Sequence, residues 1–359
     1  MRKAWILAGI VTAMVALHAC KKEDKTTEPE EIYNPTAKTI TVPAYVVNYI
    51  GELPHPEDNK LTEEGVALGR KLFYDKTLSN DGTMACASCH KQENGFDDFR
   101  QFSQGTNGAF GDRNAMPIIN LGWAKAFFWD GRRETMEGQA HDPVTNPIEM
   151  ANSWPEVVRR LQADGTYPSL FFKAFGTKTV DSNLVVKAIA QFERTMVSFN
   201  TKFDKYFYQN DVAALNEAEK RGLMLFTGDA LCNTCHMMNT LFTDHQFRNN
   251  GLDINPVDAG LMKFTSKGDD RGKFKVPGLR NIAQTAPYMH DGRFATLEEV
   301  VNFYSSNVKQ SSPNLDEHMV PFGNGLNLSV QNKADLVAFL KTLSDQEFLT
   351  RQDLSDPNK

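Results

Sequence analysis

Cys86-Ala87-Ser88-Cys89-His90 and Cys232-Asn233-Thr234-Cys235-His236 are two copies of the pattern C-x-x-C-H in a chain of 359 residues. This spacing is the attachment signature of a c-type haem, in which the two sulfurs bond to the porphyrin and the histidine reaches the iron. A zinc site or a redox dithiol can use a similar spacing, but two copies in one chain favour haem. The sequence therefore predicts two covalently attached haem c groups, with these four cysteines as attachment points and both histidines as iron ligands.

The fifth cysteine, Cys20, follows a segment with the features of a secretion signal. Arg2 and Lys3 precede an uncharged run over 4–17 that is too short to span a bilayer. The ending Leu-His-Ala-Cys is typical of a bacterial lipobox, which predicts a signal peptide at 1–19 and a lipid on Cys20. A simple secretion signal with an incidental cysteine is the alternative. Because haem c is attached outside the bacterial cytoplasm, we expect a periplasmic, membrane-anchored lipoprotein with a flexible polar tether at 20–40.

The overall charge is modestly acidic. The chain has 39 Lys and Arg against 45 Asp and Glu, a formal net charge of −6 at pH 7. This balance argues against nucleic acid as a partner and suits a basic electron-donor protein, although it also simply keeps a protein soluble. With four cysteines assigned to haem and one to lipid, none is left for a disulfide.

Helical periodicity dominates the chain, and strand patterns are scarce. Apolar residues recur at helical spacing within 61–74, 182–199, 216–226 and 329–343. A helix comes shortly before each haem motif, which suggests the duplication of one cytochrome c unit. We therefore expect an all-α fold of two cytochrome c-like haem domains in tandem with long haem-wrapping loops. The expected bounds are 41–205 and 206–345, followed by a polar tail at 346–359.

Further motifs, in their order along the chain, resemble those of the bacterial dihaem cytochrome c peroxidase family, which includes MauG-type enzymes. The resemblance covers nearly the whole mature chain and rests on RNAMP at 113–117, FWDGR at 128–132, Gln139, NPIEM at 146–150, FKVPGLRN at 274–281 and PYMHDG at 287–292. It implies that hydrogen peroxide is reduced at the N-terminal haem. Electrons would enter through the C-terminal haem from a small donor protein, a cytochrome c or a cupredoxin. Homodimer formation stays open.

The resemblance assigns roles to three residues near the haems. Glu149 would carry a proton between the two oxygens of peroxide, because a carboxyl group in a poorly solvated pocket can have a raised pKa. Gln139 would orient peroxide by hydrogen bonds, and Trp129 would relay electrons between the haems. From the residues alone, the context of Glu149 is more typical of a solvated turn, and Trp129 of a core aromatic residue.

Two further assignments come only from the resemblance. Arg280 would pair with a haem propionate, since its guanidinium would offset buried negative charge. Asn114, with the backbone carbonyls of Thr285 and Pro287, matches positions that hold a calcium ion between the domains in relatives. Hard oxygen ligands suit Ca²⁺, but no carboxylate takes part. The residues alone would therefore not suggest this site.

The chain departs from most of the family in the loop after the first haem motif. Other members carry a histidine there that blocks the first iron until the second haem is reduced. The segment 101–113 has none, and no histidine lies between His90 and His141. The sequence therefore predicts a first iron that is open or water-bound at rest.

A second departure concerns the sixth ligand of the C-terminal haem. Where most members have a methionine, this chain has Tyr304, as MauG-type enzymes do. An anionic phenolate oxygen stabilises ferric iron and lowers the reduction potential, whereas a thioether raises it. The alternative is that Tyr304 packs in the apolar stripe of its helix and that Met289 or Met319 is the ligand.

The sequence as a whole favours a dihaem peroxidase. A MauG-type enzyme that oxidises residues of a partner protein is an alternative, which the missing loop histidine and Tyr304 favour. A plain dihaem electron carrier is another. Glu149 and Gln139 speak against the carrier, because electron transfer alone needs no proton relay.

Overall fold

The computed structural model describes residues 1, 31–238, 241–323 and 325–358. The predicted signal peptide, the lipidated Cys20 and most of the predicted tether lie outside the described residues. Tyr33–Lys359 forms one compact unit, and all that follows concerns that unit. Within the described ranges, no helix combines the length and the apolar character needed to cross a bilayer.

The regular structure is almost entirely helical, as the sequence predicted. Two strands of two residues each, β1 (Phe247–Arg248) and β2 (Phe274–Lys275), pair antiparallel. Short 3₁₀ turns, including η5 (Cys232–Thr234), lie within long loops. The α-helices are α1 (Ala44–Ile50), α2 (Glu63–Tyr74), α3 (Cys86–Cys89), α4 (Met136–Thr145), α5 (Trp154–Ala163), α6 (Tyr167–Phe175), α7 (Ser182–Arg194), α8 (Lys202–Tyr208), α9 (Glu217–Thr227), α10 (Met262–Thr265), α11 (Leu297–Ser306) and α12 (Val330–Lys341).

The N-terminal core is built on the crossing of α2 and α7. These helices approach so closely that a Cβ atom on Gly69 would lie 1.9 Å from the carbonyl oxygen of Ala188. Phe73 of α2 and Phe192 of α7 pack edge to face in the buried cluster, with ring centroids 5.4 Å apart. The haem motif in α3 begins shortly after α2 and is held against this core.

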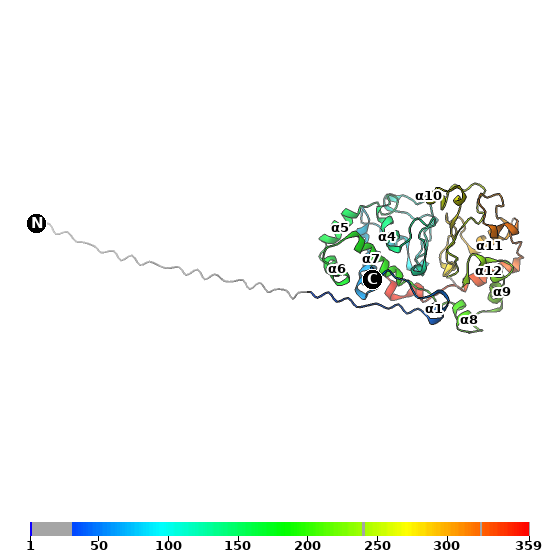
Figure 1. Ribbon diagram of the computed structural model, residues 1–359, viewed down its shortest axis with the longest axis horizontal. Helices are drawn as coiled ribbons and strands as arrows, with labels where there is room; N and C mark the ends of the chain where they lie inside the picture. The colour runs from blue at the N-terminus through cyan, green and yellow to red at the C-terminus, as the bar shows by residue number, and fades with distance from the viewer. Residues whose placement is uncertain (2–30, 239–240, 324, 359) are drawn as a thin grey trace. The chain divides into compact units, whose positions relative to one another are not determined.

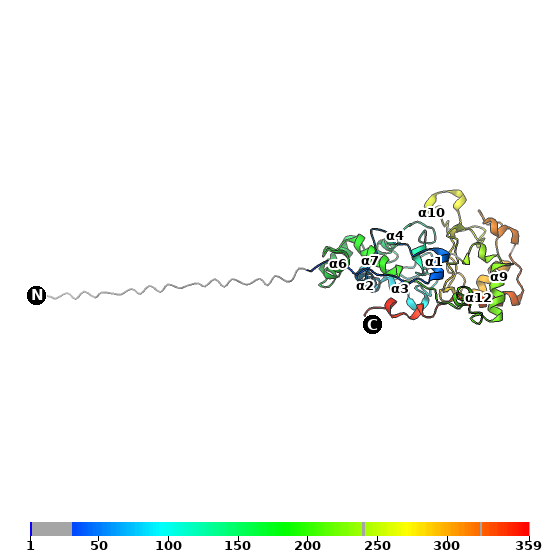
Figure 2. The same cartoon turned by 60° about the horizontal axis from the view of Figure 1, so that its bottom comes forward.

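The C-terminal core repeats this arrangement with α9 and α12. A Cβ atom on Gly222 would lie 2.0 Å from the carbonyl oxygen of Asp335. Phe226 and Phe339 take the places of the two phenylalanines of the first crossing, with centroids 5.1 Å apart. Figure 1 shows α9, α11 and α12 toward one side of the described unit and α6 and α7 toward the other, and Figure 2 shows the same for α9 and α12 against α6 and α7.

A second repeated segment lies, in each half, between the two helices that cross in the core. Phe127 pairs with Arg133 in one half and Tyr288 pairs with Phe294 in the other, each around an Asp-Gly-Arg turn. A capping threonine then begins the next helix, α4 in the first half and α11 in the second. The two segments correspond at a constant separation of 161 residues. This correspondence pairs every residue of the first segment with a counterpart in the second.

The last residues of the chain belong to the N-terminal core and do not form the polar tail that the sequence predicted. Phe348 and Leu354 are buried in that core. The Tyr74 hydroxyl donates a hydrogen bond to the Leu354 carbonyl oxygen at 2.7 Å, and Arg70 Nε donates to the Ser355 carbonyl oxygen at 2.6 Å. The prediction was wrong because two apolar side chains in a polar stretch are enough to anchor it, and the sequence pattern does not show which surface they meet.

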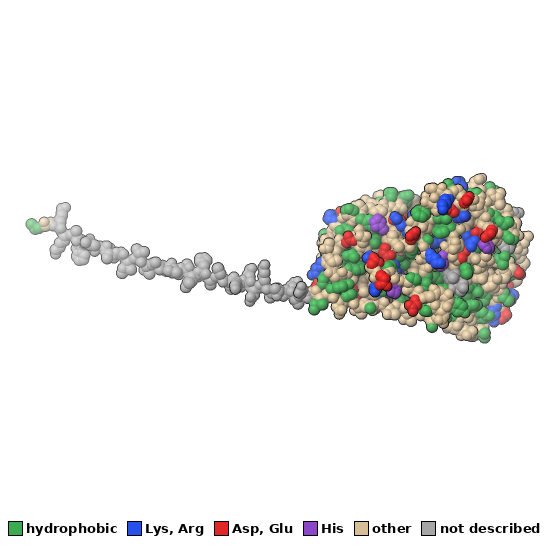
Figure 3. Space-filling model, viewed as in Figure 1, with side chains coloured by type: hydrophobic (Ala, Val, Ile, Leu, Met, Phe, Trp, Pro, Cys, Tyr) green, Lys and Arg blue, Asp and Glu red, His purple; other side chains and the backbone are tan. Residues whose placement is uncertain are grey.

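Charge is distributed without a single-sign patch on the face drawn in Figure 3. Lysine and arginine side chains lie among aspartate and glutamate side chains across this face, with apolar residues between them. Such a surface gives no strong field of one sign over this side of the molecule.

We expect Gly69→Ala to destabilise the protein by about 1–3 kcal/mol, because the added methyl group overlaps the backbone of α7. Chemical denaturation of the haem-loaded protein measures this change. Gly165→Ala is the matched control, since a Cβ atom there meets nothing within 4 Å. An equal effect of the two substitutions would contradict the close approach of α2 and α7.

Candidate functional site

Each haem motif opens into its own cavity. The N-terminal cavity has a volume of about 500 Å³ and is lined by Cys86, Cys89 and His90. The C-terminal cavity has a volume of about 250 Å³ and is lined by Cys232, Cys235 and His236. The six residues predicted to hold two haems are thus brought together in two groups of three.

Both motif histidines are oriented in the same way. His90 Nδ1 lies 2.9 Å from the carbonyl oxygen of Phe96, and His236 Nδ1 lies 3.0 Å from that of Phe242. A hydrogen bond from Nδ1 to a carbonyl group fixes the ring and leaves Nε2 free to bind a metal. Burial lowers the pKa of both imidazoles, which favours the neutral form that binds iron. Two sulfurs and one such imidazole on each cavity wall fit a covalently held haem.

The polar wall of the N-terminal cavity carries the two residues predicted to handle peroxide. Gln139 lies on α4, and Glu149 lies in the turn that follows this helix; both line the cavity. Asn146 Nδ2 donates a hydrogen bond to Glu149 Oε1 at 2.7 Å. Burial raises the pKa of Glu149, although this hydrogen bond and the charge of Arg132 oppose the rise. The carboxyl group therefore holds a proton more readily than an exposed glutamate does, which suits a group that takes up and returns a proton.

The lining of this cavity contains one histidine, His90, among the residues that the structure describes. Pro143, on α4, also lines it. By the 161-residue correspondence, Pro143 is the counterpart of Tyr304, which lines the C-terminal cavity. A proline side chain has no donor atom for a metal, whereas a tyrosine has one. Sequence reasoning missed Pro143, although the spacing of the two Asp-Gly-Arg turns could have revealed it.

Glu193 is a second residue that sequence reasoning missed. It lies on α7, lines the N-terminal cavity and is 3% exposed. Its Oε2 atom has no hydrogen-bond partner among the described residues, and burial raises its pKa to about 8. This glutamate is therefore held largely neutral beside Cys86. Nothing in the sequence pattern marked Glu193, because a single charged residue within the apolar pattern of α7 is also typical of a helix position exposed to solvent.

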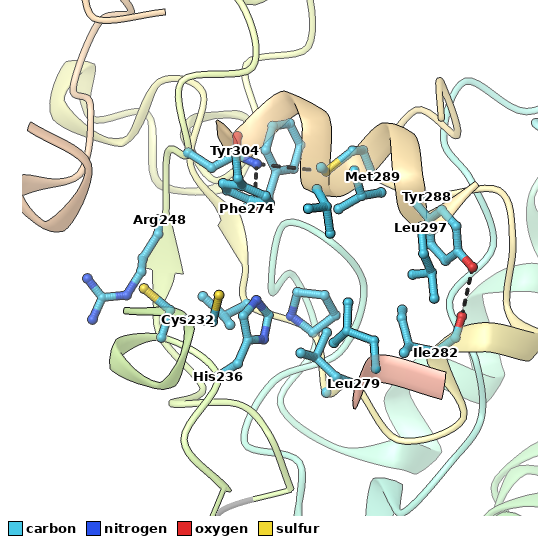
Figure 4. A pocket seen from close by; sticks show the side chains of 18 of the residues that line it. Cys232, His236, Arg248, Phe274, Leu279, Ile282, Tyr288, Met289, Leu297 and Tyr304 are labelled. Carbon is cyan, nitrogen blue, oxygen red and sulfur yellow. Dashed lines mark hydrogen bonds between the residues drawn. The ribbon is translucent and has the colours of Figure 1, made fainter. Parts of the chain in front are cut away.

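The C-terminal cavity places the three candidate sixth ligands in one lining. Tyr304, Met289 and Met319 all belong to it. Figure 4 shows Tyr304 and Met289 on the side of the cavity opposite Cys232 and His236. Asn250 Nδ2 lies 3.1 Å from the Tyr304 hydroxyl oxygen and 3.7 Å from Met289 Sδ. The choice between tyrosine and methionine as the ligand stays a prediction.

Trp129 lines both cavities. Its indole Nε1 donates a hydrogen bond to the Asn114 carbonyl oxygen at 2.9 Å, which fixes the ring at the junction of the two halves. Asn114, Ala115, Pro117 and Lys275 also line both cavities. Trp129 thus lies where the two cavities adjoin, and its role as an electron relay stays a prediction.

Arg280, the predicted propionate partner, is paired with an aspartate of the protein. It lines neither cavity, and its two terminal nitrogens pair with the Asp204 carboxylate, each at 2.9 Å. Asp204 and Arg280 are both buried, so each charge compensates the other. Arg280 Nε has no hydrogen-bond partner among the described residues, and the assignment as a propionate partner stays a prediction.

The residues of the predicted calcium site lie near one another but form no carboxylate cluster. Asn114 Nδ2 donates to the carbonyl oxygens of Arg100 and Gln101 at 3.1 and 3.2 Å. Thr285 and Pro287 line the C-terminal cavity together with Asn114. In the part of the chain that is described, no group of three or more His, Cys, Asp or Glu residues is arranged to hold a metal ion. The calcium site stays a prediction.

The fold and the two cavities define a protein of the dihaem c-type cytochrome class. The profile of the family described as di-haem cytochrome c peroxidase matches residues 63–212. The methylamine utilization protein MauG of Methylorubrum extorquens is 40% identical over 293 residues, which cover 81% of each chain. Cytochrome-c peroxidase IdrP1 of Pseudomonas sp. strain SCT is 34% identical over 340 residues, and the match covers 86% of this chain and 88% of IdrP1.

A solved structure supports the same assignment. A MauG-like protein associated with microbial copper homeostasis has a TM-score of 0.82 and 38% identity, over 90% of this chain and all of that chain. The chain described here therefore belongs to the dihaem cytochrome c peroxidase family, whose members include both peroxidases and MauG-type proteins. Membership implies two c-type haems, in agreement with the two cavities.

We expect the purified protein to hold two haems per chain, because both cavities present an intact set of two sulfurs and one oriented imidazole. A pyridine haemochrome assay measures this number. The double variant C86S/C89S should retain one covalently bound haem, in the C-terminal cavity. Haem that acid acetone extracts from the wild type would contradict covalent attachment.

Proposed function

We propose that the protein reduces hydrogen peroxide to water in the N-terminal cavity. The observation that carries this proposal is the position of Glu149 and Gln139 in the cavity that also holds His90, where Pro143 takes the place of a ligating side chain. An iron site open to peroxide, with a carboxyl group beside it, is the arrangement that cleavage of an O–O bond requires.

A bound haem would supply an iron that accepts a peroxide oxygen and exchanges electrons with it. Residues of the chain would hold peroxide and move its proton. Gln139 would hold peroxide by hydrogen bonds. Glu149 would take the proton from the oxygen nearer to the iron and return it to the farther oxygen, which leaves as water. Its raised pKa suits both steps, because a strongly acidic carboxyl group would accept the proton poorly.

Two electrons must reach the N-terminal cavity for each peroxide. We infer that they come from a small donor protein, a cytochrome c or a cupredoxin, and enter through the haem held by His236. Trp129 would connect the two haems, because it lines both cavities and its indole ring is held by Asn114. Aromatic contact at both cavities shortens the distance that the electron has to cross.

The second candidate function is MauG-type oxidation of a partner protein. The observation that favours it is Tyr304 in the C-terminal cavity, opposite His236. A phenolate ligand would stabilise the ferric state of the second haem and allow both haems to store oxidising equivalents. The 40% identity to the MauG protein of Methylorubrum extorquens supports this alternative, while the similarity to IdrP1 supports the first.

The remaining assignments concern location and a structural ion. We propose a periplasmic protein that is anchored to a membrane by a lipid on Cys20, because residues 2–20 have the sequence features of a secretion signal and of a lipobox. We further propose a calcium ion between the halves, held by Asn114 and the carbonyl oxygens of Thr285 and Pro287.

Glu149→Gln should lower kcat/KM for peroxide by at least about 10²-fold, because the substitution removes the ionisable group and keeps its shape. Steady-state turnover with a reduced cytochrome c measures this loss, and the absorption spectrum verifies that both haems are retained. Glu134→Gln, at an exposed position shortly before α4, is the control and should turn over at the wild-type rate. Wild-type turnover by Glu149→Gln would remove Glu149 from the mechanism.

The fully oxidised protein should contain one high-spin and one low-spin haem, because no second histidine lines the N-terminal cavity in the described residues. Electron paramagnetic resonance of the resting protein measures both signals. Peroxide should react with this form without prior reduction. Two low-spin signals, together with inertness to peroxide until one haem is reduced, would show that another residue closes the first iron.

Tyr304→Phe should change only the low-spin signal and raise the reduction potential of that haem, since an anionic oxygen ligand is lost. Spectroelectrochemical titration with electron paramagnetic resonance at each potential measures both effects. Met289→Leu and Met319→Leu are the matched variants and should leave the low-spin signal in place. A low-spin spectrum that survives Tyr304→Phe and is lost in one methionine variant would identify that methionine as the ligand.

A further inference from the structure

Lys275 lies at the junction of the two cavities and lines both of them. It belongs to β2 in the C-terminal half, where it pairs with Phe247 of β1, but it also donates two hydrogen bonds to the N-terminal half. Its backbone N–H donates to the Trp129 carbonyl oxygen at 2.8 Å, and its side-chain Nζ donates to the Ala126 carbonyl oxygen at 2.9 Å. One lysine therefore holds the segment that carries Trp129 at two points.

The 161-residue correspondence makes Lys275 the counterpart of Asn114. Asn114 N–H donates a hydrogen bond to the carbonyl oxygen of His290 at 2.8 Å. His290 is in turn the counterpart of Trp129, so the contacts of Asn114 and Lys275 are reciprocal. Both Asn114 and Lys275 line both cavities. The backbone is thus nearly symmetric at the junction, whereas the charge is not. One side presents a neutral amide and the other an ammonium group.

The ammonium group of Lys275 differs from the other cations around the cavities. Among the described residues, every other lysine or arginine that lines one of these two cavities has a carboxylate partner of the protein. These pairs join Arg113 to Asp130 and Asp258, Arg132 to Asp130, Lys263 to Asp258, and Arg248 to Asp244 and Asp316.

Lys275 has no carboxylate partner in the same set of residues, and Nζ has only a neutral carbonyl oxygen as its acceptor. Burial alone lowers the pKa of Lys275 to about 8, without an opposing charge to restore it. Lys275 is partly buried, and a cation withdrawn from water without an anion is costly, so proteins seldom retain one without a counter-charge. The anion that completes this site should therefore come from what fills the cavities.

We propose that Lys275 pairs with a carboxylate of the haem itself, a propionate at the junction of the cavities, and that its charge raises the reduction potential of the N-terminal haem. A positive charge near an iron stabilises the reduced state, which carries one positive charge fewer. The N-terminal haem is the one affected most, because Nζ reaches Ala126 in that half. Lys275 is a positioning residue in this scheme, since it acts on electron transfer through the haem and does not touch peroxide.

This inference rests on the proposed pair of haems and deepens the electron path of the proposed function. It does not depend on peroxide turnover, because reduction potentials are equilibrium properties of the loaded protein. A failure of the peroxide mechanism would appear in Glu149→Gln and leave the potentials as they are. The two proposals can therefore fail separately.

The test is a potentiometric titration of K275Q, K275M and K275R, with both haems followed by absorption and electron paramagnetic resonance. K275Q keeps a hydrogen-bond donor without the charge, K275M removes both, and K275R keeps both. We expect the equilibrium constant for reduction of the N-terminal haem to fall about tenfold in K275Q and K275M, equivalent to a shift of about 59 mV for one electron. K275R should stay within about twofold of the wild type, because the charge is retained.

K263Q is the matched control. Lys263 also lines the N-terminal cavity, but it is paired with Asp258 and its side chain is 44% exposed, so the loss of its charge should change the same constant by less than about twofold. Potentials in K275Q and K275M equal to those of the wild type would overturn the proposal. A change in K275M that is absent in K275Q would also overturn it, because the hydrogen bond to Ala126 would then be the cause.

A second measurement decides the case in which the neutral variants do not load both haems. Resonance Raman spectra of the wild type and K275R report the bending band of the haem propionates. Exchange of an ammonium partner for a guanidinium should shift this band for one haem. Identical propionate bands in the two proteins would overturn the pairing, whatever the neutral variants do.

Discussion

The reciprocal backbone hydrogen bonds between the two halves are the constraint on which the functional arrangement depends. The N–H of Asn114 donates to His290 and that of Lys275 donates to Trp129, both at 2.8 Å. Because each donor is the counterpart of the other, the junction has the character of an isologous contact between repeated units. It brings the two cavities together at Trp129, which would otherwise line only one of them.

Duplication of the backbone with divergence of the side chains explains how one architecture can perform two tasks. Pro143 and Tyr304 lie at corresponding positions, one unable and one able to ligate iron. Trp129 and His290 correspond as well, and Trp129 lines both cavities whereas His290 lines the C-terminal one. The helices that carry Pro143 and Tyr304 begin at equivalent threonine caps, so the difference lies in the side chains and not in the fold. Such asymmetry suits two cavities with different tasks, in which the N-terminal cavity would bind substrate and the C-terminal cavity would pass electrons.

Burial sets the protonation of the N-terminal cavity. Glu149 and Glu193 both have a raised pKa, because carboxylates lose hydration there. Asn146 and Arg132 limit the rise at Glu149, whereas Glu193 Oε2 has no partner among the described residues. Two carboxyl groups in one cavity are thus held in different environments. Glu149 is suited to exchange protons, and Glu193 to stay neutral beside Cys86.

The sequence by itself determined the two haem motifs, the helical class and the family, because covalent attachment and helical periodicity are written in local residue spacing. It also singled out Glu149, Gln139 and Trp129, through short motifs that keep their order. The tertiary structure alone decided what depends on contacts between distant segments. It paired Arg280 with Asp204, buried Phe348 and Leu354 in the first core, and left Lys275 between the cavities without a carboxylate. Such partners lie up to hundreds of residues apart, and no local pattern specifies which distant group a buried charge or an apolar side chain will meet.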